Sequence, residues 1–378
     1  LRASGNDWNY TMFRDGLLQQ ACRRGGLNLA LQAFRPSVVY LNGEFLGIHN
    51  IREKVNEEYI ETRYGLEAGT FDMIEGDQNV EAGDWEEWNH YKELWQKDLS
   101  VQSNYDALAA IMDVENYTDF MVAQIWSHNT SVNHNPMAWK PKEGGVWRWI
   151  FTDGDRGFNN YADDYTDWYA GKANMPFGSM LKNEGYSRYF CKRAADLLFT
   201  AFNPEEIQRQ VTEHSKDIEP LMEQQVQRWL GTSSSYSGNA LTSTRQWRSR
   251  ISYLRDFCNG RPIVLLWDMY ENYGTGAPAL LTLTGKNGFE FNGLAINKDK
   301  WCGSYPTDME ITLTARQRVG YTFKGWRENA VKKLISTGNE WKYLDDGSTP
   351  ASWYTTSFDD SGWKAGASPL GYDTDNKM

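Results

Sequence analysis

The sequence predicts an α+β fold in which a domain of mixed helices and strands is followed by a small all-β domain. Three observations lead to this class. An Asn-Gly pair at residues 42–43 separates two apolar extended runs, which is typical of a β-hairpin. Apolar residues recur at helical spacing between residues 203 and 229. From about residue 277 onward, the apolar period changes to two.

Capping residues and apolar stripes indicate the helices. Residues 12–24 look helical, and Asp113 stands before an apolar helical segment whose free N–H groups its side chain would cap. Asn203 is followed by a proline and two glutamates, which is the pattern of an N-cap, a first-turn proline and acids at the positive helix end. We expect helices to dominate from about residue 179 to residue 258.

The strands are predicted around turn residues. Residues 34–50 read as two strands joined by a type I′ turn, in which Asn42 and Gly43 both take positive φ. Two further strands, near residues 137–140 and 146–152, flank a Gly-Gly turn. The second of these strands runs directly into Asp153-Gly154-Asp155.

Composition shifts divide the chain into three predicted domains. A Gly- and Pro-containing stretch at residues 274–278 marks the first boundary, so residues 1–273 form the α+β domain. Short strands with glycine turns over residues 277–330 indicate a small β-sandwich-like domain. Residues 337–378 are too short to close a sheet, and we interpret them as the start of a truncated jelly-roll-like β-module.

Charge and composition exclude several function classes. The net charge is −11, so the chain repels phosphate backbones and nucleic acid is not an expected partner. The four cysteines lie far apart without a CxxC pair, which does not support a zinc site or a disulfide scaffold. No apolar run is long enough to cross a membrane. The 17 Trp and 21 Tyr residues fit either a large aromatic core or a surface that binds sugars or peptides.

Asp153 and Asp155 form the strongest candidate for a chemical site. If both lie on an extended strand, residues two apart face the same side about 6.5–7 Å from each other, which suits one metal cluster. A calcium loop and ordinary turn carboxylates are alternative interpretations. A glycosidase acid pair is disfavoured because two acids adjacent on one strand do not lie on opposite sides of a sugar.

Several spaced motifs resemble the CotH family of spore-coat kinase-like proteins. Residues 41–54, with the sequence LNGEFLGIHNIREK, are similar to its NGeYxGxYxxrEk stretch. Residues 147–158, WRWIFTDGDRGF, resemble its strand and DxDxGF loop. Asp7 and residues 12–14 match its upstream D…mR helix, and the resemblance covers roughly residues 1–265.

The resemblance implies a reduced protein-kinase-like domain that uses ATP with Mg²⁺ or Mn²⁺, or holds Ca²⁺ instead. By this resemblance Asp155 and Asp153 are catalytic metal ligands, and Asn135 is a further metal ligand. Ser131 stands where many members carry an Asp that is a candidate base or metal ligand. The residues implied at the nucleotide are Arg52, Glu53, Lys54 and Asn129. Packing of Arg52 on aromatic rings, surface charges at Glu53 and Lys54, and turn capping by the two asparagines are the alternatives.

The family's function implies a protein substrate and an extracellular or cell-surface location. Glycan or cell-wall contact is implied for the C-terminal β-modules. Family members carry phosphate-binding strands before the segment that corresponds to residue 1, so we expect an incomplete ATP site and no protein phosphorylation by the chain as it stands. Two alternatives remain, namely a non-catalytic kinase-like scaffold and a carbohydrate-binding assembly built on the aromatic residues.

Overall fold

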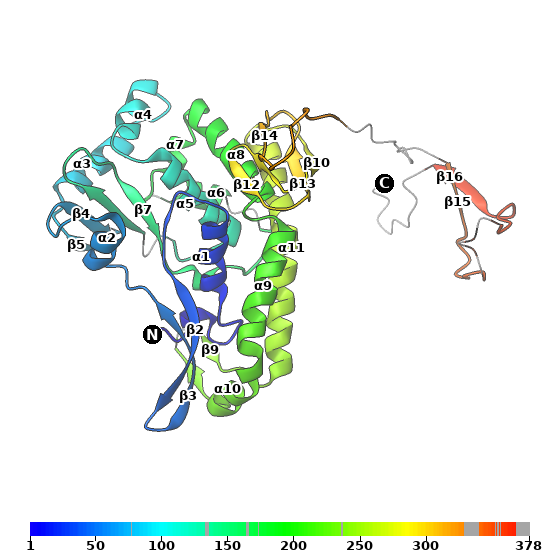
Figure 1. Cartoon of the computed structure of the whole chain (residues 1–378), viewed down its shortest axis with the longest axis horizontal. Coiled ribbons are helices and arrows are strands. Elements are labelled where there is room, and N and C mark those ends of the chain that lie inside the picture. Colours follow the sequence, from blue (N-terminus) through cyan, green and yellow to red (C-terminus); the bar gives the residue numbers. More distant parts are fainter. Residues whose placement is uncertain are drawn as a thin grey trace. The chain divides into compact units, whose positions relative to one another are not determined.

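The computed structural model describes residues 1–328 and 340–367, except residues 77, 133–135, 164–165, 173, 236, 352, 354 and 356. It divides into two compact units, Leu1–Tyr321 and Thr322–Met378. The first unit mixes helices and strands, as the α+β prediction requires (Figure 1). No helix in the described part of the chain combines the length and apolarity that crossing a membrane requires.

A five-stranded sheet forms the centre of the first unit. Its strands follow the order β1-β7-β6-β4-β5, and only the pairing of β1 with β7 is parallel among the described strands. Alternation along the strands sends Ile74 and Phe151 into the main core, while Met73 and Ile150 pack with Ile60 on the other face. The bounds are β1 (Ala30–Leu31), β4 (Phe71–Glu75), β5 (Asn79–Ala82), β6 (Met137–Pro141) and β7 (Arg148–Phe151).

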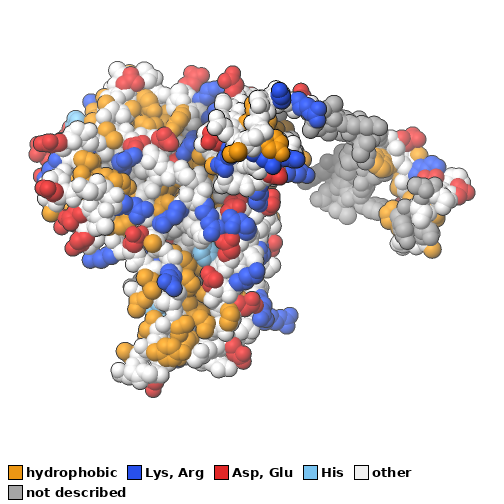
Figure 2. Space-filling model, viewed as in Figure 1, with side chains coloured by type: hydrophobic (Ala, Val, Ile, Leu, Met, Phe, Trp, Pro, Cys, Tyr) orange, Lys and Arg blue, Asp and Glu red, His pale blue; other side chains and the backbone are white. Residues whose placement is uncertain are grey.

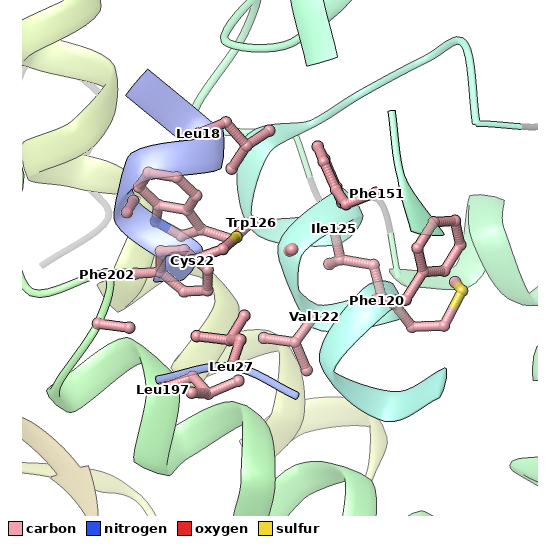
Figure 3. Packing of buried hydrophobic residues seen from close by; sticks show 14 of the residues in the cluster. Leu18, Cys22, Leu27, Phe120, Val122, Ile125, Trp126, Phe151, Leu197 and Phe202 are labelled. Carbon is pink, nitrogen blue, oxygen red and sulfur yellow. The ribbon is translucent and has the colours of Figure 1, made fainter. Parts of the chain in front are cut away.

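Helices cover the sheet and build the rest of the unit. Figure 3 shows side chains of α1, α5 and β7 in one apolar cluster, and Trp126 stacks on Phe202 with ring centroids 4.2 Å apart. The helices are α1 (Arg14–Arg24), α2 (Glu57–Tyr64), α3 (Glu86–Trp95), α4 (Gln102–Ala109), α5 (Val114–Ser127), α6 (Thr166–Ala170), α7 (Phe177–Met180), α8 (Glu184–Phe199), α9 (Pro204–Ile218), α10 (Met222–Trp229) and α11 (Thr244–Asn272).

Both predicted N-caps are confirmed. The Asp113 side chain accepts a hydrogen bond of 2.9 Å from the N–H of Asn116 at the start of α5. The Asn203 side chain accepts one of 3.0 Å from the N–H of Glu205, and Pro204 opens α9. These bonds satisfy N–H groups that a helix leaves without a partner at its start.

The predicted hairpin is also confirmed. Strands β2 (Phe34–Leu41) and β3 (Glu44–Arg52) pair antiparallel, and Asn42 and Gly43 have φ of 52° and 84°. The hairpin extends away from the five-stranded sheet and rests on α10 (Figure 1), where Gln225 accepts a hydrogen bond of 2.8 Å from the N–H of Ile48. Apolar side chains gather on its surface in Figure 2, and Tyr40 is 59% exposed.

Short strands follow α11, and they pack on the helices. Strands β10 and β13 pair antiparallel, and β11 pairs with both β12 and β14. Phe291 lies 4.5 Å from Phe199 of α8, between ring centroids, and the indole N–H of Trp301 donates to the carbonyl of Phe199 at 2.8 Å. The bounds are β10 (Pro278–Thr284), β11 (Phe289–Phe291), β12 (Leu294–Ile296), β13 (Lys300–Pro306) and β14 (Leu313–Ala315).

The second unit contains one described strand pair. Strands β15 (Glu340–Tyr343) and β16 (Lys364–Ala367) run antiparallel. Lys342 forms an ion pair of 2.8 Å with Asp360, and Phe358 packs edge-on against Trp363. A jelly-roll module here stays a prediction.

Candidate functional site

The Asp153–Asp155 segment is a tight turn and not a continuation of the strand. Strand β7 ends at Phe151, Asp153 takes a left-handed conformation with φ of 55°, and Gly154–Arg156 forms a 3₁₀ turn, η2. The expectation that the two acids lie on an extended strand is therefore wrong. The turn is held by α1, because the N–H of Gly154 donates a hydrogen bond of 3.1 Å to Asp15.

The two carboxylates nevertheless converge, because a segment far away in sequence joins them. Nη2 of Arg2 contacts Oδ1 of Asp153 and lies 2.6 Å from Oδ2 of Asp155. The backbone N–H of Asn6 donates to Oδ2 of Asp155 at 2.9 Å, and the Asn6 side chain donates to Oδ1 at 3.2 Å. Both oxygens of Asp155 thus have partners in the segment Arg2–Asn6.

Asp155 is almost completely buried, with 1% of its surface exposed. Burial raises the pKa of Asp155, and the nearby carboxylate of Asp153 raises it further, while Arg2 and the hydrogen bonds from Asn6 act in the opposite direction. The approach of the backbone is close as well, since a Cβ atom on Gly5 would lie 2.1 Å from Oδ2 of Asp155. A glycine at position 5 is therefore required for this arrangement.

A second ion pair, which is buried on both sides, lies beside the first. Arg52, at the end of β3, contacts the carboxylate of Asp15 and donates to the side-chain oxygen of Gln32 at 2.8 Å. Burial alone raises the pKa of Asp15, but Arg52 and Arg2 outweigh it and hold that pKa below its usual value. Arg52 therefore neutralises the acid that positions the η2 turn, and its ring contact with Phe34, 5.9 Å to the centroid, is secondary.

The loop after α5 reaches the same turn through Asn129. The Asn129 amide donates to the carbonyl of Asp153 at 3.1 Å and to the side chain of Gln124 at 2.9 Å. Its side-chain oxygen accepts a hydrogen bond of 3.1 Å from the N–H of Ser131, and Ser131 is buried. This geometry is the turn-capping alternative for Asn129, and it ties the position of Ser131 to the acidic turn.

The remaining predicted site residues are placed as follows. Glu53 accepts a hydrogen bond of 2.6 Å from the N–H of Ala33, and it lies 3.7 Å from Arg63. Lys54 is exposed at the end of the hairpin. Asn135 lies outside the described residues, so the predicted convergence of Asn135 with the two aspartates stays a prediction.

Three residues of this cluster escaped the sequence analysis, namely Arg2, Asn6 and Asp15. Their contacts join positions 149 or more residues apart in the case of Arg2 and Asn6, and no local spacing encodes such a contact. Asp15 stands in the first turn of a predicted helix, where an acid is usually an exposed residue that interacts favourably with the helix dipole. Its burial was not predictable from that position.

The acidic pair fits a divalent ion in part. No group of three or more His, Cys, Asp or Glu side chains that could hold a metal occurs in the described part of the chain. However, Oδ1 of Asp153 and Oδ2 of Asp155 both approach the same nitrogen of Arg2, so they face one cation-sized position. Mg²⁺ and Mn²⁺ prefer such oxygen ligands and complete their shells with water or phosphate oxygens.

Comparison with known proteins agrees with the motifs. A search of curated proteins finds no match for this chain. The family model described as CotH kinase protein matches residues 1–265, which include the hairpin, the loop after α5 and the acidic turn. That match spans well over half of the sequence, and this chain therefore belongs to the CotH kinase family.

Proposed function

We propose that this chain contains an atypical protein-kinase domain that transfers the terminal phosphoryl group of ATP to secreted or cell-surface proteins. The observation that carries the proposal is the convergence of Asp153 and Asp155 on one cation position, inside the part of the chain that matches the CotH kinase family. Phosphoryl transfer depends mainly on cations that neutralise the phosphates and on a positioned acceptor. We place this activity outside the cell or at its surface.

Each described residue of the site has a separate role in the proposed phosphoryl transfer. Asp155 and Asp153 would hold Mg²⁺ or Mn²⁺, which supplies charge neutralisation at the phosphates. Asn129 keeps the loop of Ser131 against the acidic turn through the carbonyl of Asp153. Since a serine hydroxyl is a poor base, Ser131 would orient the acceptor hydroxyl and not remove its proton. Arg52 acts at a distance by keeping Asp15 charged beneath the turn.

The test is transfer of ³²P from labelled ATP to acceptor protein with Mg²⁺ or Mn²⁺, measured on the chain extended by the N-terminal strands that the family resemblance implies, since the chain as it stands is expected not to phosphorylate protein. We expect Asp155→Asn to lower the rate at least 100-fold, because it removes the charge that holds the ion. The control is Asp106→Asn, an exposed acid on α4 bonded to Gln102. Equal transfer by the wild type and Asp155→Asn would contradict the proposal.

A non-catalytic scaffold is the second candidate, and two observations favour it. The guanidinium of Arg2 already supplies one positive charge to the acidic pair, and Ser131 stands where an acid is common in the family. Such a scaffold would act through its C-terminal residues on glycan or cell wall, where Trp353 is 52% exposed. Absence of transfer by a folded wild type under both metals, together with retention on cell-wall glycan, would favour the scaffold.

A further inference from the structure

The chain at Arg2 and Ser4 is held in place by contacts that do not involve the acidic pair. The N–H and carbonyl of Arg2 form two hydrogen bonds with Asn50 of β3, at 2.8 and 2.7 Å. The Asn50 side chain donates to the hydroxyl of Ser4 at 2.8 Å, and that hydroxyl donates to the carbonyl of Met12 at 3.1 Å. Four hydrogen bonds therefore anchor the backbone on which Arg2 stands, whatever its side chain contacts.

The side chain of Arg2, unlike its backbone, has no such anchor among its described contacts. Its described side-chain contacts are with Asp153 and Asp155, and 32% of its side-chain surface is exposed. Asp155 by contrast is 1% exposed and stays bonded to Asn6. An arginine with one face in solvent can rotate away without unfolding the segment, because the bonds to Asn50 do not involve the guanidinium.

A metal ion and the guanidinium cannot occupy this position together. Nη2 of Arg2 lies 2.6 Å from Oδ2 of Asp155 and also contacts Oδ1 of Asp153. A divalent ion held by these oxygens would lie about 2.1 Å from each of them, which places it within the volume of that nitrogen. Repulsion between the two cations adds to the steric conflict.

We propose that Arg2 is an internal cation that competes with a divalent metal ion for Asp153 and Asp155, so that its side chain must leave before the metal binds. This competition rests on the proposed kinase function only in the choice of a divalent metal ion as the ligand. Arg2 would then inhibit metal binding from within the part of the chain that matches the family model. It also gives the buried carboxylate of Asp155 a cation partner when no metal is bound.

The test measures Mn²⁺ binding without nucleotide on the full 378-residue chain, from the electron paramagnetic resonance signal of free Mn²⁺. We expect Arg2→Ala to bind Mn²⁺ at least tenfold more tightly than the wild type. The double variant Arg2→Ala with Asp155→Asn should lose this gain. The matched control is Arg248→Ala, which removes an exposed arginine paired with Glu219 and should leave Mn²⁺ affinity unchanged.

Equal or weaker Mn²⁺ binding by Arg2→Ala would overturn the competition. A second measurement covers the case in which this variant folds poorly, since two unneutralised carboxylates would then repel each other. Mn²⁺ should restore its thermal unfolding transition, because a ligand that binds only the folded state stabilises it. A variant that remains unfolded at millimolar Mn²⁺ would also overturn the proposal.

The competition and the proposed function fail in different ways. Tighter Mn²⁺ binding by Arg2→Ala, without phosphoryl transfer by the N-terminally extended protein, would support the competition and contradict the kinase. Transfer that depends on Asp155, together with Mn²⁺ affinity that is the same in the wild type and Arg2→Ala, would support the kinase and contradict the competition.

Discussion

Two arginine–aspartate pairs near the start of the chain have the same chemistry and opposite accessibility. The side chains of Arg14 and Asp7 are both 2% exposed, and Nε of Arg14 lies 3.3 Å from Oδ1 of Asp7. Arg2 is 32% exposed, while its partner Asp155 is 1% exposed. We call the pair of Arg14 and Asp7 the sealed pair, because neither side chain reaches solvent, and its role is structural. We call the pair of Arg2 and Asp155 the open pair, because Arg2 reaches solvent and another cation can replace it.

The surroundings of the two pairs explain this difference. Asp7 also accepts hydrogen bonds from the N–H groups of Thr11 and Arg14, at 2.9 and 2.8 Å, so it organises the chain that enters α1. Nη1 of Arg14 donates to the carbonyl of Gly157 at 3.1 Å, which ties α1 to the residues after the acidic turn. The buried pair of Arg14 and Asp7 therefore holds the start of α1 and the residue Gly157 close to the acidic turn that Arg2 contacts.

The largest expected effect comes from breaking the sealed pair. Arg14→Ala leaves the carboxylate of Asp7 buried without its cation, and we expect a loss of about 3–5 kcal/mol in the free energy of unfolding. Urea denaturation followed by tryptophan fluorescence measures it. Arg248→Ala, in an exposed ion pair, should change stability by less than about 0.5 kcal/mol. A loss below about 1 kcal/mol for Arg14→Ala would show that the two pairs do not differ as described.

The pH dependence of the sealed pair comes next. Burial raises the pKa of Asp7 to about 6, although Arg14 and the hydrogen bonds to Asp7 lower it. A raised folded-state pKa means that the folded chain binds the proton more tightly, so this contribution is complete below about pH 4 and is lost as pH rises through 6. The wild type should gain up to about 3 kcal/mol relative to Asp7→Asn between pH 7 and pH 4. A flat difference across that range would contradict the assignment.

Breaking the open pair should cost less. Asp155 keeps two hydrogen bonds from Asn6 when Arg2 is removed, and the neighbouring Asp153 side chain is 24% exposed, so solvent screens part of the remaining charge. We expect Arg2→Ala to lower the free energy of unfolding by about 1–2 kcal/mol in the absence of metal. Equal losses for Arg2→Ala and Arg14→Ala in the same urea titration would erase the distinction between the pairs.

The smallest expected effect concerns Asn6. Its side chain donates one hydrogen bond of 3.2 Å to Asp155, while its backbone N–H donates another that mutation leaves intact. Asn6→Ala should therefore cost about 0.5–1.5 kcal/mol, and it should leave Mn²⁺ affinity within about threefold of the wild type. A large gain in Mn²⁺ affinity would mean that Asn6, and not Arg2, blocks the ion.

Local chemistry in the sequence was sufficient for the elements that surround the site. The turn at Asn42 and Gly43, and the caps at Asp113 and Asn203, depend on conformations and hydrogen bonds within a few residues, and all are confirmed. The family assignment is confirmed over residues 1–265 because spaced motifs survive in order along the chain.

Local chemistry was insufficient at the acidic turn. The two-residue spacing of Asp153 and Asp155 was interpreted on an extended strand, but Asp153 adopts the left-handed region, where the N–H of Gly154 can reach Asp15. A single hydrogen bond to a buried acid from another element outweighs a local preference that is weak at a strand end. The two aspartates were expected to face one side of a strand. They instead lie in a turn, and their carboxylates meet at the guanidinium of Arg2.

The sequence by itself predicted that Asp153 and Asp155 act together, since they are neighbours in a motif that resembles one of the CotH family and lies in the matched residues. Only the tertiary structure decided which cation meets them. Arg2 and Asp155 are 153 positions apart, and they come together because β3 pairs with the backbone of Arg2 while α1 holds the η2 turn. Coulomb attraction acts through space and not along the chain, so a buried charge finds its partner by packing.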